Sequence, residues 1–255
     1  MSLVAYAVRT TLWRALLGKT YAQDRVYDSQ VAPIDETVQG QPEPFIIVAT
    51  DDETSEISGH DYIGASRDLD VVIEIALASE LRRDGGINIP HTDEGLEMAL
   101  NFMTRQVMRV LQADDDPWAE LFRTFALSTK KMATRRGASV EKGVRFAARQ
   151  IVLSVAPLHE PEFGRAPCGA WADLIAAMRA DDILSVFADG LEEEITGIAI
   201  PDWARLKARL GLTNVGASAV GLGPLEQGEA PAPASELSSN GERLGFEVKA
   251  EEGAD

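Results

Sequence analysis

The sequence has 255 residues, of which 41 are acidic and 24 are basic, so its formal net charge is −17. This length suffices for one substantial core, or for one domain with an appendage, and a hydrophobic content of 45% is ordinary for a globular protein. The acidity argues against a chain that seeks nucleic acid as a whole, because duplex binding depends largely on neutralising phosphates. Cys168 is the only cysteine, which excludes an intramolecular disulfide.

The first 80 residues predict one helix and three strands. Apolar residues recur at helical spacing between Leu3 and Leu16. A short strand is expected at 25–28 and a central strand at 45–50, where β-branched residues dominate. Large apolar residues then recur at every second position from Leu69 to Leu77, which is the period of a strand and predicts one at 69–79.

A long amphipathic helix is predicted over 92–111. About twenty residues span roughly 30 Å, enough to cross one face of a sheet. An aspartate before Pro117 indicates that a short helix begins there and continues to residue 125. The apolar stripe of the long helix consists of Leu96, Leu100, Met103, Val107, Val110 and Leu111.

A weaker strand is expected at 126–134, a turn at 136–139, and a long strand at 144–156, closed by Pro157. The apolar residues of the long strand change parity near its middle. A β-bulge at Arg149-Gln150 would let both halves face the same core, so we predict one there.

Beyond Pro157 the sequence predicts helices at 169–180, 181–188 and 201–210. From residue 216 onward Gly, Ala, Pro, Ser and Glu dominate, which is typical of disorder. The expected fold is α/β (α+β), with a mostly antiparallel sheet packed by one long helix. The expected divisions are an α/β domain at 1–160, a helical extension at 161–215 and a disordered acidic tail at 216–255.

No catalytic or cofactor motif is recognisable, and the run Asp114-Asp115-Asp116 lacks the ligand spacing of a calcium loop. We therefore expect no catalysis, no metal and no cofactor. An alternative of another class is a metal-dependent nuclease that uses Asp70 and Glu74, which share one face of the 69–79 strand. Against it, Ala76 stands where such enzymes carry a lysine.

Two charged segments are candidate interaction sites. Eight basic residues and one acid lie between Arg123 and Arg149, a segment that should pair with a neighbouring subunit's acidic loop or with DNA, unless it is simply a solvated face. The acidic connection at 51–64 could contact a partner, or be an ordinary surface loop. The residues singled out are Lys130, Lys131, Arg135, Arg136 and Lys142, with Asp51, Asp52, Glu53 and Glu56.

The order of elements resembles the tail terminator (tail-completion) family of long-tailed bacteriophages, of the minor tail protein U type of lambda-like phages. The resemblance covers about residues 1–160 and rests on three places. They are Leu12-Trp13-Arg14-Ala15-Leu16-Leu17 leading to Arg25-Val26-Tyr27-Asp28-Ser29, then Pro44-Phe45-Ile46-Ile47-Val48 before the alternating strand, and Gly143-Val144-Arg145-Phe146-Ala147-Ala148-Arg149-Gln150-Ile151. Residues 161–255 depart from the compact family pattern.

The resemblance implies a structural virion protein that forms a ring, typically a hexamer, at the head-proximal end of the tail tube. Its partners would be further copies of itself, the major tail tube protein and the head-tail connector, with DNA passing through the lumen without specific binding. No membrane contact is expected. A head-completion or neck adaptor protein of the same kind of particle is the related alternative.

Overall fold

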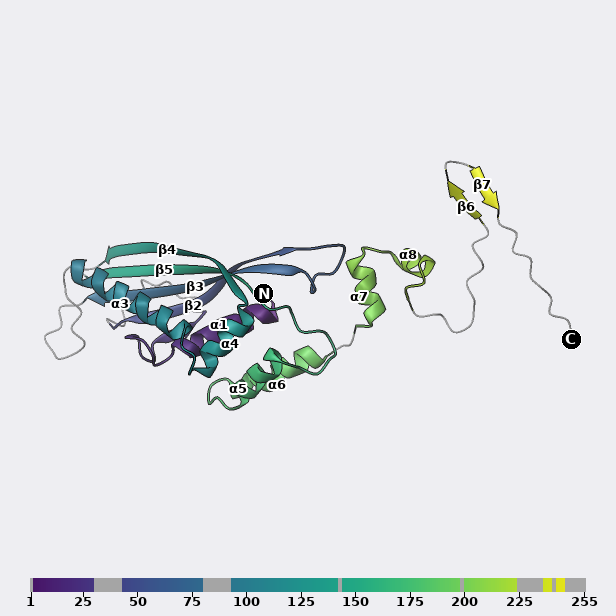
Figure 1. Ribbon diagram of the computed structural model, residues 1–255. Coiled ribbons are helices and arrows are strands. Elements are labelled where there is room, and N and C mark those ends of the chain that lie inside the picture. The colour runs from purple at the N-terminus through teal and green to yellow at the C-terminus, as the bar shows by residue number, and fades with distance from the viewer. Residues whose placement is uncertain are drawn as a thin grey trace. The chain divides into compact units, whose positions relative to one another are not determined.

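The computed structural model describes residues 2–29, 43–79, 93–141, 144–197, 200–223, 236–239 and 242–245. The chain divides into two compact units, Met1–Gly211 and Leu212–Asp255. The first unit contains a five-stranded sheet and the helices packed on it (Figure 1). The boundary expected between residues 160 and 161 lies inside this unit.

The sheet is mostly antiparallel, as the sequence predicts. Its strands lie in the order β1-β2-β3-β5-β4, and only the pairing of β1 with β2 is parallel among the described strands. The strands are β1 (Val26–Asp28), β2 (Phe45–Glu56), β3 (Ser66–Ser79), β4 (Ser128–Glu141) and β5 (Val144–Ala156). The short β1 and the long β4 are therefore the two edges.

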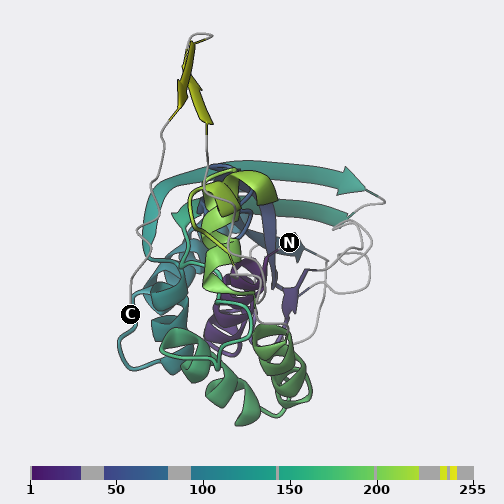
Figure 2. The same cartoon turned by 90° about the vertical axis from the view of Figure 1, so that its right-hand side faces the viewer.

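Three helices cover one face of the sheet, and Figure 2 shows them gathered on that side. They are α1 (Leu3–Leu16), α3 (Asp93–Leu111) and α4 (Pro117–Phe125). Residues of one parity on β3 and β5, such as Ile73 and Ile151, are fully buried against this layer. The long helix α3 contributes Leu100, Met103 and Val107 to the same core, as its apolar stripe predicts.

Local polar contacts fix the connection between α3 and α4. The Arg123 guanidinium donates to the carbonyl oxygens of Leu111 at 3.0 Å and Ala113 at 2.8 Å, which satisfies groups left open at the end of α3. The Asp116 carboxylate accepts from the Trp118 N–H at 3.2 Å and caps α4, with Pro117 in its first turn.

Helices α5 (Ala170–Arg179) and α6 (Ser185–Thr196) belong to the same core. Trp171 of α5 packs edge-to-face on Phe125 of α4, with ring centroids 4.9 Å apart. Helix α6 begins later than the sequence predicts and runs further. The Asp181 carboxylate accepts from the N–H groups of Ile183 at 2.9 Å and Leu184 at 3.0 Å, which builds a turn before the helix.

Helix α7 (Asp202–Arg209) lies against the connection between β2 and β3. The His60 N–H donates to the Ala208 carbonyl at 2.6 Å. Gly59 has a φ of +66° there, and a Cβ on it would lie 2.5 Å from the same carbonyl oxygen. Only glycine fits this approach.

The strands differ from the sequence prediction in three ways. Residues 51–56 continue β2 rather than forming a loop, and residues 136–139 continue β4 rather than turning. The predicted bulge at Arg149-Gln150 is wrong, because β5 pairs in unbroken register there with both β3 and β4. The register shifts lie instead between Thr50 and Glu53 and between Thr129 and Lys131.

The second unit contains helix α8 (Asn214–Ala219) and a two-stranded hairpin of β6 (Glu236–Ser239) and β7 (Glu242–Gly245). The hairpin and all of α8 but its first two residues fall within the tail predicted to be disordered at 216–255. The rest of that tail, at 224–235, 240–241 and 246–255, lies outside the described residues. None of the helices that the structure describes has the length and apolarity to cross a bilayer.

Candidate interaction surface

The face of the sheet opposite α1, α3 and α4 carries a row of polar side chains. On β3 the Asp70 carboxylate accepts from the Ser154 hydroxyl of β5 at 2.5 Å. Four residues further along β3, the Glu74 carboxylate accepts from the Gln150 amide at 2.9 Å. Residues on one face of a strand recur every second position, so these four side chains lie on one surface. We call it the open face.

Strand β4 extends the open face to the edge of the sheet. Lys131 lies opposite Ser154 and Arg135 lies opposite Gln150, and directly opposite residues of an antiparallel pair share a face. Both cationic side chains are exposed, and neither has an ion-pair partner among the residues that the structure describes. The open face thus ends in two positive charges, those of Lys131 and Arg135, that no acid among the described residues neutralises.

The other predicted cations of β4 are already paired. Lys130, the extra residue at the register shift, forms an ion pair with Asp68 of β3. Arg136 lies opposite Arg149 on the helix-covered side, where its guanidinium is 3.3 Å from the Glu97 carboxylate of α3. Lys142 lies outside the described residues.

Two further cations of the basic segment serve the fold rather than a partner. Arg123 caps α3, as described above. Arg149 is largely buried, forms an ion pair with Glu97 and donates to the Asn101 side chain at 2.6 Å. Fewer than the eight basic residues of this segment can therefore bind a partner. On β4 the cations that remain for a partner are Lys131 and Arg135.

The predicted acidic residues lie on β2. Asp51 and Asp52 form the register shift of that strand, and both are exposed, as is Glu56. Glu53 points inward and pairs with Arg67 of β3 at 2.7 Å. Burial raises the pKa of the Glu53 carboxyl, but hydrogen bonds from Arg67 and Ser2 outweigh it and hold the pKa below its ordinary value. Glu53 is therefore structural.

The acidic set and the basic set do not meet within one subunit. Strands β3 and β5 lie between β2 and β4, and adjacent strands are about 4.8 Å apart, so β2 and β4 are separated by about 14 Å. A contact between the Asp51-Asp52 bulge and the β4 cations requires a second copy of the chain or another partner.

The geometry of Asp70 and Glu74 does not suit a shared metal ion. Four residues along a strand correspond to about 13 Å, whereas two ligands of one Mg²⁺ each lie about 2 Å from it. Each carboxylate is instead engaged by a polar side chain of β5. Within the described residues no group of three or more His, Cys, Asp or Glu side chains has metal-site geometry.

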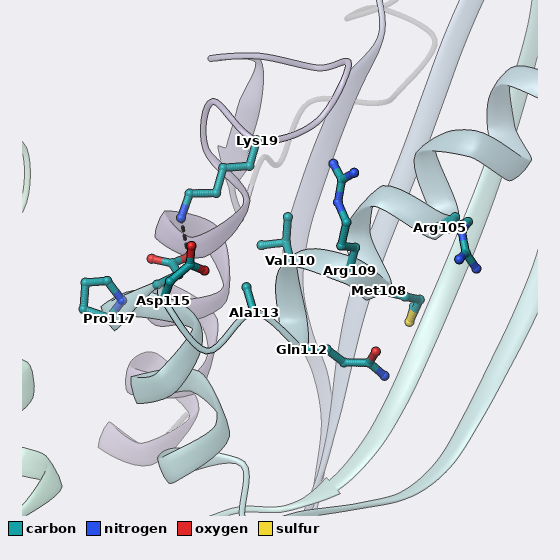
Figure 3. A pocket seen from close by; sticks show the side chains of 10 residues that line it. Lys19, Arg105, Met108, Arg109, Val110, Gln112, Ala113, Asp115 and Pro117 are labelled. Atoms are coloured by element: carbon teal, nitrogen blue, oxygen red, sulfur yellow. Dashed lines mark ion pairs between the residues drawn. The ribbon is translucent and has the colours of Figure 1, made fainter.

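A concavity of about 940 Å³ lies beside the C-terminal half of α3, and the sequence analysis did not identify it (Figure 3). Lys19 reaches across it to pair with Asp116. Arg105 and Arg109 project from α3 along its wall, and neither is in an ion pair with another described residue. The signal that could have revealed it is two arginines at i and i+4 on the polar side of an amphipathic helix.

The sequence matches no protein-family model, and no curated protein is similar to it. The surfaces of the molecule that could bind a partner are the open face, the edge strand β4 and the outer side of α3.

Proposed function

We propose that this chain is a structural virion protein of the tail terminator type. It forms a ring, with six subunits as the expected number, on the head-proximal end of a phage tail tube. The ring stops polymerisation of the tube and offers the surface that joins the tail to the head connector. The observation that carries the proposal is the edge strand β4, which is fourteen residues long and carries on its open face two exposed cations without an ion-pair partner among the described residues.

A free edge strand is a template for another chain. Its outward N–H and C=O groups are unpaired within the sheet, and proteins that remain alone usually shorten or cover such edges. From Ser128 to Gly137 every side chain of β4 is exposed except the half-buried Ala133. The opposite edge, β1, has only three residues. One edge is therefore far better suited to association than the other.

The distribution of charge supports a head-to-tail contact. Asp51 and Asp52 lie on β2, and Lys131 and Arg135 lie on β4, so one subunit presents opposite charges near opposite edges of its sheet. Two different patches that complement each other make a heterologous contact, and such contacts close into a ring when the rotation between subunits permits. A ring adds no further subunits, which is what a stop signal for a polymer needs.

The overall acidity supports passage of DNA through the ring. A lumen lined by a protein of net charge −17 repels phosphates, so DNA slides through without being held. In this account the cations of β4 face a neighbouring subunit or the tail tube rather than the lumen.

The test is a double charge reversal on the open face, Lys131→Glu with Arg135→Glu. Both side chains are exposed, so the fold should remain intact by circular dichroism and urea denaturation. We expect the variant to lose ring assembly, or docking to purified tail tubes, in negative-stain electron microscopy. The matched control is Lys207→Glu with Arg209→Glu on α7, which changes the net charge equally but lies away from β4.

Normal rings and normal docking from the β4 variant would remove β4 from the interface. Equal loss in both variants would mean that net charge, rather than this edge, controls assembly. Rings that form but fail to join the head, with tubes of normal length, would favour the neck adaptor role.

A further inference from the structure

The outer side of α3 carries an apolar patch that continues into a basic one. Met98 and Phe102, about half exposed at 51% and 48%, lie one turn apart. Arg105 and Arg109 follow on the same stripe, at the next helical positions. Large exposed apolar side chains grouped on one helix face mark an interaction site more often than scattered ones do. We call these four residues the α3 stripe.

Helix α6 carries the same arrangement with acids in place of arginines. Val186 and Phe187 are 75% and 58% exposed at its start, and Ile183 just before them is 50% exposed. Glu193 and Glu194 follow seven residues after Val186 and Phe187, on the same side of the helix. Neither glutamate is in an ion pair with another described residue. We call these five residues the α6 knob.

The α6 knob is held in place from behind. The buried Asp181 carboxylate accepts two backbone N–H groups and pairs with Arg14 of α1. Burial raises the pKa of Asp181, but those hydrogen bonds and the charge of Arg14 outweigh it and keep the pKa below its ordinary value. Leu184 and Ala188 anchor the same segment in the core. The exposed apolar side chains therefore stand on a rigid support, which limits the entropy lost on binding.

We propose that the α6 knob of one subunit docks on the α3 stripe of the next copy of the chain. With the two helices parallel, Phe187 aligns with Phe102, and Glu194 aligns with Arg109, because both steps are seven residues, or about 10 Å. Apolar side chains then meet apolar ones, while the Glu194 carboxylate meets the Arg109 guanidinium. The occupant is a second copy because this chain itself supplies the complement in both apolar pattern and charge.

A hollow on the α3 stripe fits the Phe187 ring. It measures about 260 Å³ and is lined by Tyr21, Phe102, Arg105, Gln106 and Arg109. A cavity of about 150 Å³ can hold a benzene molecule, so a phenyl side chain fits this one. The guanidinium groups beside it can rest on the ring face. Gly190, in the middle of α6, leaves open space that lets the two helices approach closely.

This contact is heterologous, since α3 and α6 are different surfaces, and it therefore suits a closed ring. The inference rests on the proposed ring, but it names a specific pair of surfaces. The exposed cations Lys131 and Arg135 of β4 and Arg105 and Arg109 of α3 would then face one neighbour, and the acids on β2 and α6 would face the other.

The test is disulfide cross-linking between two singly substituted proteins, Phe102→Cys and Phe187→Cys, both in a Cys168→Ser background. Each replaced side chain is about half exposed, so folding is not at risk. We expect a disulfide-linked dimer when the two proteins are mixed at high concentration and oxidised, and none from either alone. The control pairs Phe187→Cys with Leu206→Cys, which is 43% exposed but lies on α7, outside the proposed contacts.

An exchange of charge between Arg109 and Glu194 tests the polar part of the proposed contact. Arg109→Glu alone and Glu194→Arg alone should each weaken self-association by about tenfold in sedimentation equilibrium, because like charges then face each other. Combining them should restore most of it. A double variant as weak as the singles would contradict this pairing.

The remaining outcomes separate this inference from the proposed function. Oligomers without the mixed disulfide would overturn the α6–α3 contact and leave the ring role standing. A disulfide from Phe187→Cys to itself would mean an isologous contact and would also overturn it. A chain that stays monomeric without cross-linking, or whose Phe187→Cys links to a different protein in assembled particles, would overturn self-docking. The terminator role would then be judged by tail length alone.

Discussion

The two faces of the five-stranded sheet are made by the same strands but by residues of opposite parity. On β5, Ile151, Leu153 and Val155 are buried under the helices, while Gln150, Val152 and Ser154 alternate with them on the open face. The covered face is largely apolar, with Arg149 paired to Glu97 of α3, while the open face carries hydrogen-bonded polar groups and ends in the exposed cations Lys131 and Arg135 of β4. If β4 makes the proposed contact, folding and association depend on different residues of the same sheet, so each can be altered separately.

Two neighbouring residues of β5, one on each face, should differ most in their contribution to stability. Ile151→Ala should lower the free energy of unfolding by about 4 kcal/mol, because it empties a fully buried site. Val152→Ala, one residue away on the half-buried open face, should cost about 1 kcal/mol or less. Urea denaturation measures both. Equal losses would mean that the open face is as much a part of the core as the covered one.

Replacing Arg67 tests the contribution of its buried ion pairs at the end of the β2–β3 hairpin. Its guanidinium contacts Glu53 at 2.7 Å and Glu160 at 3.4 Å, and all three side chains are largely buried. Arg67→Ala leaves two carboxylates without their cation and should cost about 3 kcal/mol. If acidification to pH 4 does not relieve part of this loss, the carboxylates are not the cause.

The lowered pKa of Asp181 should make the free energy of unfolding depend on pH. Its pKa in the folded protein lies below the unfolded value of about 3.9, so the folded state binds the proton less strongly. Its contribution to stability is therefore complete above the unfolded pKa and is lost as the pH falls through the folded pKa. Between pH 5 and pH 2 the urea midpoint should fall less steeply in Asp181→Asn than in the native chain.

The smallest effect is expected on the open face. Ser154→Ala removes the hydrogen bond to Asp70 and should cost about 1 kcal/mol, since the carboxylate can take up water instead. Assembly should remain normal, because the free cations of β4 are untouched. Failure of assembly in this variant would show that the polar row itself, rather than β4, makes the contact.

The positions of the strands could be predicted from the sequence, but the face of the sheet on which each apolar residue of β5 lies could not. The alternation of 69–79 and the stripe of 92–111 led to β3 and α3. The bulge predicted at Arg149-Gln150 assumed that every apolar residue of β5 must face the helices. Ala148 and Val152 instead lie on the open face, which also buries Phe45 and Ala76 near β2.

The charged residues of the candidate site could be predicted from the sequence, but their contacts in the fold could not. The free cations Lys131 and Arg135 were found, whereas the paired roles of Arg136 and Arg149 depend on Glu97, which only the fold brings near. The α3 stripe and the α6 knob were missed. Met98 and Phe102 lie outside the apolar stripe of α3, and such off-stripe apolar residues are the sequence signal that would have revealed the patch.

The most direct measurement is electron microscopy of particles assembled without this gene. The account predicts tails that are overlong or unjoined beside DNA-filled heads, because only the loss of a stop signal lets tubes overrun. Tails of normal length that fail to attach would contradict the terminator role, as would intact, infectious particles.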